Sequence, residues 1–127
     1  MVLALLRSGA RVQLSTRGRS MWPAIPSRSQ VEVEPCAAAE LRAGEVAAFE
    51  RGGRIIVHRV QQVAKSGVYF AGDSSWSGDG CVPIERVLGR VHMIERRSLR
   101  WRLPQRNDAH RLWWLVKRRL GFSSYRK

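Results

Sequence analysis

Three short segments of the chain carry residues that could together perform acyl transfer on a serine. Ser20 lies in the run GRSMWP, His58 lies in the run IVHRV, and Asp73 and Asp79 lie in a loop rich in glycine and serine. Serine chemistry needs a nucleophile, a base that removes its proton, and a carboxylate that orients the base. The sequence therefore offers Ser20 as nucleophile, His58 as base and one of the two aspartates as the orienting group.

Ser20 is flanked by residues that favour a tight turn. Gly18 lets the chain turn tightly and leaves room for a substrate backbone, while Pro23 stiffens the exit from the turn. Backbone N–H groups in such a turn can stabilise an oxyanion. Most serines in these surroundings only shape turns, so Ser20 alone does not establish a nucleophile.

His58 lies in a run of β-branched residues, which predicts a strand. The period of two places Ile56, His58 and Val60 on one face of that strand. An unperturbed imidazole is mostly neutral at pH 7, so it can accept a proton and return it to a leaving group. The alternative is a core histidine that is hydrogen-bonded to a backbone carbonyl.

Asp73 and Asp79 are both able to act on the imidazole. An aspartate that accepts the second ring N–H fixes the tautomer and favours the imidazolium that forms during the reaction. Aspartates also shape turns by binding their own backbone, so the loop alone does not decide between the two roles.

The middle of the chain is dominated by strand signals. Alternating or β-favouring runs predict strands at residues 11–15, 30–34, 45–49, 55–60, 68–70 and 87–94. Gly52 and Gly53 lie between two of these runs and predict a tight hairpin, because only glycine adopts positive φ cheaply. We therefore expect a compact, mostly antiparallel β fold.

Length and charge indicate one domain with a basic extension. A chain of 127 residues can bury one modest core. The formal net charge is +13, and residues 96–127 hold eleven of the 23 Lys and Arg but one of the ten acids. We expect a β domain over residues 1–95 and a basic extension over 96–127 that is not an independent domain.

The basic extension is predicted to contain an amphipathic helix from Ala109 to Gly121. Its apolar side carries Leu112, Trp113, Val116 and Leu120, with Lys and Arg nearby. Such a helix could lie in a membrane interface against anionic lipid, or could pack on its own domain.

The apolar N-terminal stretch stops at Arg7, which is too short for a membrane-spanning helix or a secretory signal. We therefore expect a cytoplasmic or peripheral membrane protein. Cys36 and Cys81 could form one disulfide, although free thiols are the expectation in a reducing compartment. No metal and no cofactor is predicted.

Four segments resemble, in the same order, the conserved boxes of the serine peptidase superfamily that contains type I signal peptidases and LexA-type self-cleaving repressors. Ser20, Met21 and Pro23 resemble its Ser-Met-x-Pro box, and GEVAAF at 44–49 resembles its Gly-Asp-x-Val-x-Phe strand. Gly72-Asp73 resembles its Gly-Asp box, and residues 83–91 resemble the strand that follows. The resemblance covers residues 10 to 94.

The residue that acts as the general base differs between the subfamilies of this peptidase superfamily. Bacterial signal peptidases and LexA-like proteins use a lysine where this chain has His58, so the chain resembles the endoplasmic-reticulum and archaeal type with a Ser/His/Asp arrangement. In that type the functional acid follows the Gly-Asp box by several residues, which implies Asp79 as orienter and Asp73 as a supporting acid. Gly18 replaces a hydroxyl residue that helps the oxyanion hole in many signal peptidases, which leaves the Ser20 N–H as donor.

The resemblance implies a serine endopeptidase of signal-peptidase type that processes a peptide or protein precursor. The sequence departs from the family in that neither the membrane anchor of signal peptidases nor the DNA-binding domain of LexA-type repressors is expected. Small side chains are expected before the cleaved bond. Two non-catalytic alternatives remain. The basic, tryptophan-rich tail could bind nucleic acid, although we do not expect that partner, or it could dock a degenerate peptidase fold on a membrane surface.

Overall fold

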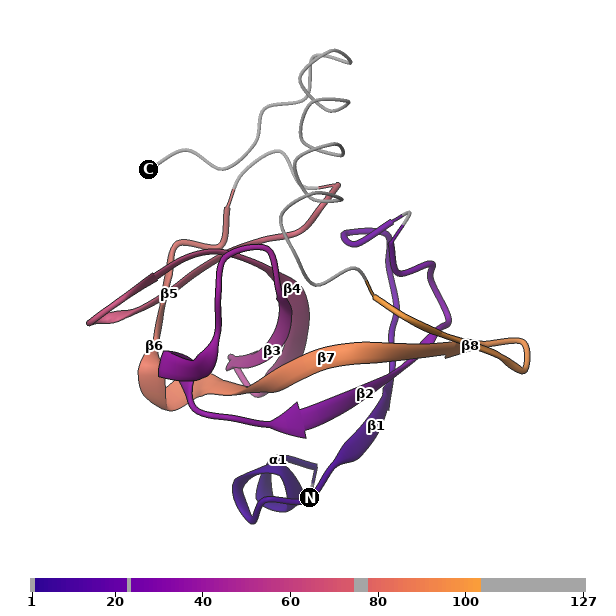
Figure 1. The fold of residues 1–127 in the computed structure, drawn as a ribbon, viewed down its shortest axis with the longest axis horizontal. Helices are drawn as coiled ribbons and strands as arrows, with labels where there is room; N and C mark the ends of the chain where they lie inside the picture. The colour runs from indigo at the N-terminus through magenta and orange to yellow at the C-terminus, as the bar shows by residue number, and fades with distance from the viewer. Residues whose placement is uncertain (1, 23, 75–77, 104–127) are drawn as a thin grey trace.

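The computed structural model describes residues 2–22, 24–74 and 78–103 (Figure 1). Within these residues the chain forms one short helix, α1 (Val2–Arg7), and one sheet. The strands are β1 (Val12–Ser15), β2 (Gln30–Pro35), β3 (Val46–Arg51), β4 (Arg54–Ala64), β5 (Gly67–Ala71), β6 (Cys81–Pro83), β7 (Val87–Arg96) and β8 (Leu99–Arg102). Two 3-10 helices, η1 (Ala38–Glu40) and η2 (Ile84–Arg86), connect strands.

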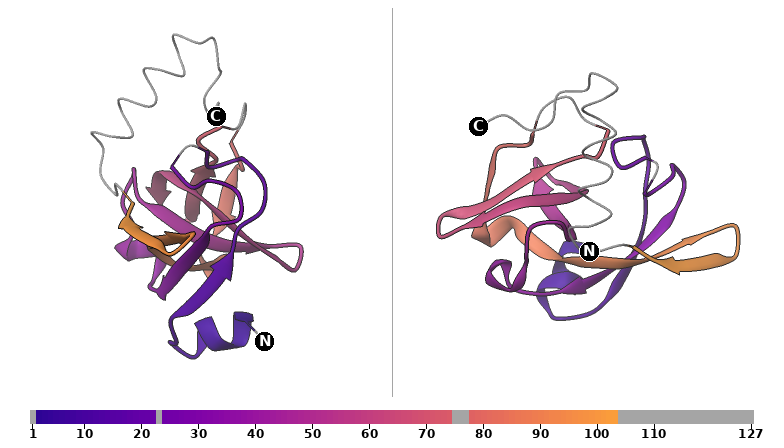
Figure 2. Two further views of the ribbon diagram at one scale, coloured as in Figure 1. Left: turned by 90° about the vertical axis from the view of Figure 1, so that its right-hand side faces the viewer. Right: turned by 45° about the horizontal axis from the view of Figure 1, so that its top comes forward.

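The sheet has the strand order β1-β2-β7-β3-β4-β5-β6, and β8 pairs with β7. All of these pairings are antiparallel. The sheet curls so that β3, β4 and β5 turn across the long strand β7, while α1 lies outside it next to β1 and β2 (Figures 1 and 2). The predicted mostly antiparallel β fold is confirmed.

Strand β3 explains how one sheet can have a core on both faces. All four residues from Val46 to Phe49 are buried. Since successive side chains point to opposite faces, Val46 and Ala48 join one hydrophobic cluster and Ala47 and Phe49 join a second. The run VAAF is therefore continuous rather than alternating because both faces of β3 are covered.

Strands occur at all six predicted positions, and the Gly52-Gly53 hairpin is confirmed, with φ of +58° and +78°. Helix α1 was not predicted; it buries Leu6 in the first cluster, which explains the apolar start of the chain. Strand β6 was also missed, because three residues are too few to show a period. The helix predicted from Ala109 to Gly121 lies outside the described residues.

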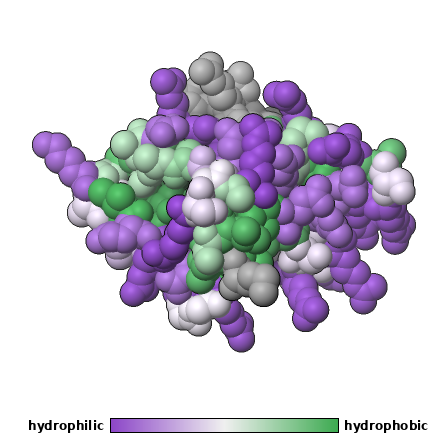
Figure 3. Space-filling model, turned by 90° about the horizontal axis from the view of Figure 1, so that it is seen from below, coloured by the Kyte–Doolittle hydropathy of each residue, from purple (hydrophilic) through white to green (hydrophobic). Residues whose placement is uncertain are grey.

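Hydrophilic residues cover most of the surface seen in Figure 3, with small hydrophobic patches between them. This agrees with the high content of basic residues in the sequence. Among the described residues, no helix combines the length and the apolar character that crossing a membrane requires.

The two cysteines are both free thiols. Burial raises the pKa of the Cys36 thiol, so less of it is thiolate at a given pH, whereas Cys81 is exposed. We expect iodoacetamide at pH 8 to alkylate Cys81 at least several-fold faster than Cys36, because the thiolate is the reactive form. Mass spectrometry of timed samples measures both rates, and the difference should vanish in denaturant. Faster labelling of Cys36 in the folded protein would contradict this assignment.

Candidate active site

The loop that carries Ser20 leaves the sheet after β1 and returns before β2. Its base is closed by backbone bonds, since the Thr16 N–H donates to Ser29 O at 2.8 Å and the Arg28 N–H donates to Thr16 O at 3.1 Å. Gly18 has a φ of +86°, a conformation that glycine adopts at little cost, and it allows the tight turn expected before Ser20. The closed loop presents Ser20 as an exposed residue.

His58 lies on β4 opposite Ala47 of β3. On the other edge of β4, the pairing with β5 begins at Arg59. Residues 54–58 do not pair with β5, and His58 is the last residue of this unpaired stretch. The His58 side chain is 11% exposed, and its ring meets the ring of Phe49 edge to face with 6.2 Å between centroids. The strand therefore holds the ring in a mostly buried position at the end of an open strand edge.

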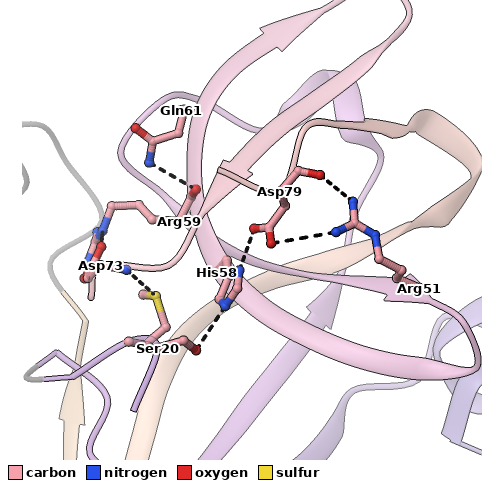
Figure 4. Close-up of polar contacts among 8 residues, drawn as sticks. Ser20, Arg51, His58, Arg59, Gln61, Asp73 and Asp79 are labelled. Atoms are coloured by element: carbon pink, nitrogen blue, oxygen red, sulfur yellow. Dashed lines mark hydrogen bonds and ion pairs between the residues drawn. The ribbon is translucent and has the colours of Figure 1, made fainter. Parts of the chain in front are cut away.

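Ser20, His58 and Asp79 form one chain of hydrogen bonds (Figure 4). His58 Nε2 lies 3.0 Å from Ser20 Oγ, and His58 Nδ1 lies 2.6 Å from Asp79 Oδ2. A neutral ring that donates its Nδ1 proton to the carboxylate leaves Nε2 free to accept the serine proton. The structure thus brings together Ser20, His58 and Asp79, the three residues expected from the sequence to form the relay.

Asp73 does not contact His58. Its carboxylate accepts two hydrogen bonds from Arg59, each of 2.9 Å, and the two side chains are 3% and 4% exposed. Arg59 also donates to Gly44 O at 2.8 Å. The N–H of Asp73 points at Met21 Sδ, 3.4 Å away, and Met21 is buried in the first hydrophobic cluster. Asp73 and Met21 therefore lie beneath the site and link its loops.

Ser74 ties the loop after β5 to the serine loop. Its N–H donates to Ser20 O at 2.8 Å, and its hydroxyl donates to Trp22 O. Further along, the N–H of Asp79 donates to Phe70 O at 2.8 Å, so the acid is fixed to the end of β5. Pro23, the last residue of the Ser-Met-x-Pro run, lies outside the described residues.

Two arginines at the site were not foreseen from the sequence. Arg51, at the end of β3, contacts Asp79 with both terminal nitrogens (Figure 4). Arg59 was placed by period two on the face of β4 opposite His58, but nothing in the sequence indicated that it is buried against Asp73.

A groove of about 590 Å³ leads to the reactive groups. Residues 14–18, Ser20, Met21 and Ile25 form one side, and residues 54–58 of β4 form the other. Within the described part of the chain, β1 pairs only with β2, and the 54–58 stretch pairs only with β3, so both strands turn an open edge to the groove. Unpaired strand edges can accept an extended peptide by backbone hydrogen bonds.

The described residues contain no cluster of three or more His, Cys, Asp or Glu side chains that could hold a metal ion. The tail residues that the membrane and nucleic-acid alternatives depend on, among them Leu112, Trp113, Val116 and Leu120, lie outside the described ranges. No protein-family model matches the chain, and no curated protein matches it.

Proposed function

We propose that the protein is a serine endopeptidase of signal-peptidase type that processes a peptide or protein precursor. The observation that carries this proposal is the relay in which Ser20 Oγ meets His58 Nε2 at 3.0 Å and His58 Nδ1 meets Asp79 Oδ2 at 2.6 Å. The curled antiparallel sheet agrees with the signal-peptidase and LexA-like fold that the sequence boxes suggest.

The chemistry follows from this arrangement. Ser20 Oγ attacks the carbonyl carbon of the cleaved bond while His58 Nε2 takes the hydroxyl proton. Asp79 holds the ring and stabilises the imidazolium. His58 then gives the proton to the leaving amine as the C–N bond breaks, which leaves an ester on Ser20. Water, deprotonated by His58, attacks the ester, and the acid product leaves as Ser20 regains its proton.

The oxyanion that forms during the attack needs hydrogen-bond donors. Within the described residues, the Ser20 N–H has no hydrogen-bond acceptor, while its carbonyl is held by Ser74. This N–H is therefore available to bind the oxyanion. Gly18 has no side chain that could add a hydroxyl donor beside it.

The substrate is an extended segment that lies in the groove between β1 and the 54–58 stretch of β4. Backbone groups on the open strand edges bind its main chain, and the partly apolar lining, with Leu14, Met21 and Ile25, receives its side chains. The superfamily resemblance adds a preference for small side chains before the cleaved bond.

A fluorophosphonate probe tests the nucleophile without knowledge of the substrate, because it phosphonylates a serine that a neighbouring base activates. We expect the full chain to be labelled at Ser20, as located by mass spectrometry after digestion. Labelling should disappear in Ser20→Ala and fall strongly in His58→Ala. Ser8→Ala serves as the matched control, since Ser8 is exposed directly after α1 and, within the described residues, its hydroxyl donates only to Leu5 O of that helix.

Hydrolysis is tested with a library of peptides from a digested proteome, whose new termini are identified by mass spectrometry. We expect cleavage by the wild type and by Ser8→Ala but not by Ser20→Ala. Cleavage that survives both Ser20→Ala and His58→Ala would show that another group does the chemistry, and the proposed function would then be wrong.

A further inference from the structure

Arg51 contacts Asp79 at two points. Its Nη2 donates to the backbone oxygen of Asp79 at 2.6 Å, and its Nη1 lies 3.7 Å from Asp79 Oδ1. The other carboxylate oxygen, Oδ2, is the one that meets His58 Nδ1. Asp79 therefore lies between the guanidinium and the imidazole, with one oxygen directed at each (Figure 4).

Arg51 is itself held in place by β3. Its guanidinium carbon lies 5.3 Å from the centroid of the Phe49 ring, two residues back on the same face of the strand. Phe49 is fully buried and packs edge-on against His58. One rigid strand thus supports both the ring that touches the imidazole and the cation that touches the carboxylate.

Asp79 needs such support because it does not belong to a strand. It precedes β6, which begins at Cys81, and the backbone bond to Phe70 O fixes only its N–H. A carboxylate on a loop positions an imidazole well only if other groups hold its backbone and its second oxygen. Arg51 contacts both.

We propose that Arg51 is a positioning residue for the candidate active site. It fixes Asp79 so that Oδ2 stays on His58 Nδ1, and its positive charge partly offsets the negative charge that the Asp79 carboxylate places next to the imidazole. This inference rests on the proposed function. The fork geometry of arginine is needed, because a lysine brings one point charge and cannot span the carboxylate and the backbone oxygen together.

Charge and geometry can be separated by two variants. Arg51→Gln removes the charge, so Asp79 attracts the imidazolium more strongly, and the acid limb of the kcat/KM profile should move to higher pH. Arg51→Lys keeps the charge and should leave that limb in place. Both variants lose the fork, and we expect kcat to fall about tenfold in each, within the range of a mispositioned base.

Among the residues that the structure describes, few other groups act on the imidazole. The ring contacts the Ser20 hydroxyl, the Asp79 carboxylate and the Phe49 ring, and Arg51 lies behind the carboxylate. The next charged pair, Arg59 with Asp73, neutralises itself on the opposite face of β4. A shift of the acid limb in Arg51→Gln therefore reports the contact with Asp79.

The His58 ring can be observed without any turnover. NMR of the full chain labelled with ¹⁵N-histidine should show the Nδ1 proton far downfield, as expected for a bond of 2.6 Å to a carboxylate. We expect this resonance to move upfield or broaden in both Arg51 variants. Arg54→Gln is the matched control for this signal, because Arg54 is the cross-strand neighbour of Arg51 and has no ion pair among the described residues.

Activity is followed by the rate of fluorophosphonate labelling and by hydrolysis of a peptide found in the library. Arg42→Gln, an exposed change outside the groove, serves as the control for the loss of one positive charge.

Ethylguanidinium added to Arg51→Gly should restore part of the labelling rate, because the free cation can occupy the space beside Asp79. Circular dichroism confirms folding, and Arg51→Lys carries the test if the glutamine variant does not fold.

The outcomes separate the two proposals. An unchanged ring signal in both Arg51 variants and an unchanged acid limb in Arg51→Gln, with labelling of Ser20 intact, would overturn the role of Arg51 alone. Absence of Ser20 labelling in the wild type would overturn the proposed function, while the ring signal would still show whether Arg51 holds Asp79.

Discussion

Replacing Asp79 by asparagine is expected to lower kcat about 10³-fold to 10⁴-fold with little change in KM. The amide can donate its N–H to His58 Nδ1, which places the ring proton on Nε2 and leaves no acceptor for the Ser20 hydroxyl. The site keeps its shape but holds the wrong tautomer. Initial rates on a peptide identified in the library, measured over a range of concentrations, give both constants.

The stability of the same variant distinguishes this loss from unfolding. Asp79 is 17% exposed and its ion pair with Arg51 is partly exposed, so the free energy of unfolding should fall by only about 1 kcal/mol. Glu85→Gln, which removes an exposed acid of η2, is the matched control and should keep wild-type rates. A kcat within threefold of the wild type in Asp79→Asn would remove Asp79 from the mechanism.

The positions of Ser20 and His58 could be predicted because each depends on a short local pattern. Period two fixes the face of His58 once β4 is assigned, and Gly18 marks a turn that needs a positive φ. No local pattern of this sort distinguishes Asp73 from Asp79 as the partner of the imidazole. Residue chemistry leaves both open, and only the resemblance to the boxes of the peptidase superfamily favours Asp79, the residue that meets His58.

The two arginines could not be predicted because their partners come from elsewhere in the chain. Arg51 meets Asp79 because the end of β3 lies next to the segment between β5 and β6 that carries Asp79. This proximity depends on the curl of the whole sheet. Arg59 looks like an exposed residue in sequence, since a charged side chain is rarely buried without a partner. Its burial follows from the pairing with Asp73, fourteen positions later.

Among the described residues, the buried ion pair between Arg59 and Asp73 is expected to contribute more to stability than any other ion pair. Asp73→Asn leaves the Arg59 guanidinium buried without its carboxylate, and we expect the free energy of unfolding to fall by about 3 to 5 kcal/mol. The melting temperature should fall by about 10 °C or more. Thermal and urea denaturation measure both quantities. Since Asp73 also begins the loop that binds Ser20 through Ser74, activity should fall as well.

A double variant tests whether the loss in stability comes from the Arg59 charge that remains when the Asp73 carboxylate is removed. The double variant Arg59→Met/Asp73→Leu buries no charge, so its free energy of unfolding should fall less than that of Asp73→Asn. The double-mutant cycle with the two single variants gives the interaction energy between the two side chains.

Arg11→Gln is the exposed comparison, because its ion pairs with Glu32 and Glu34 lie at the surface and their loss should cost about 1 kcal/mol or less. Equal stability losses at Arg11 and Asp73 would mean that burial does not set the strength of the inner pair. A large loss at Asp73 with a small one at Asp79 would instead assign the two acids separate tasks, one in holding the loops together and one in holding the imidazole.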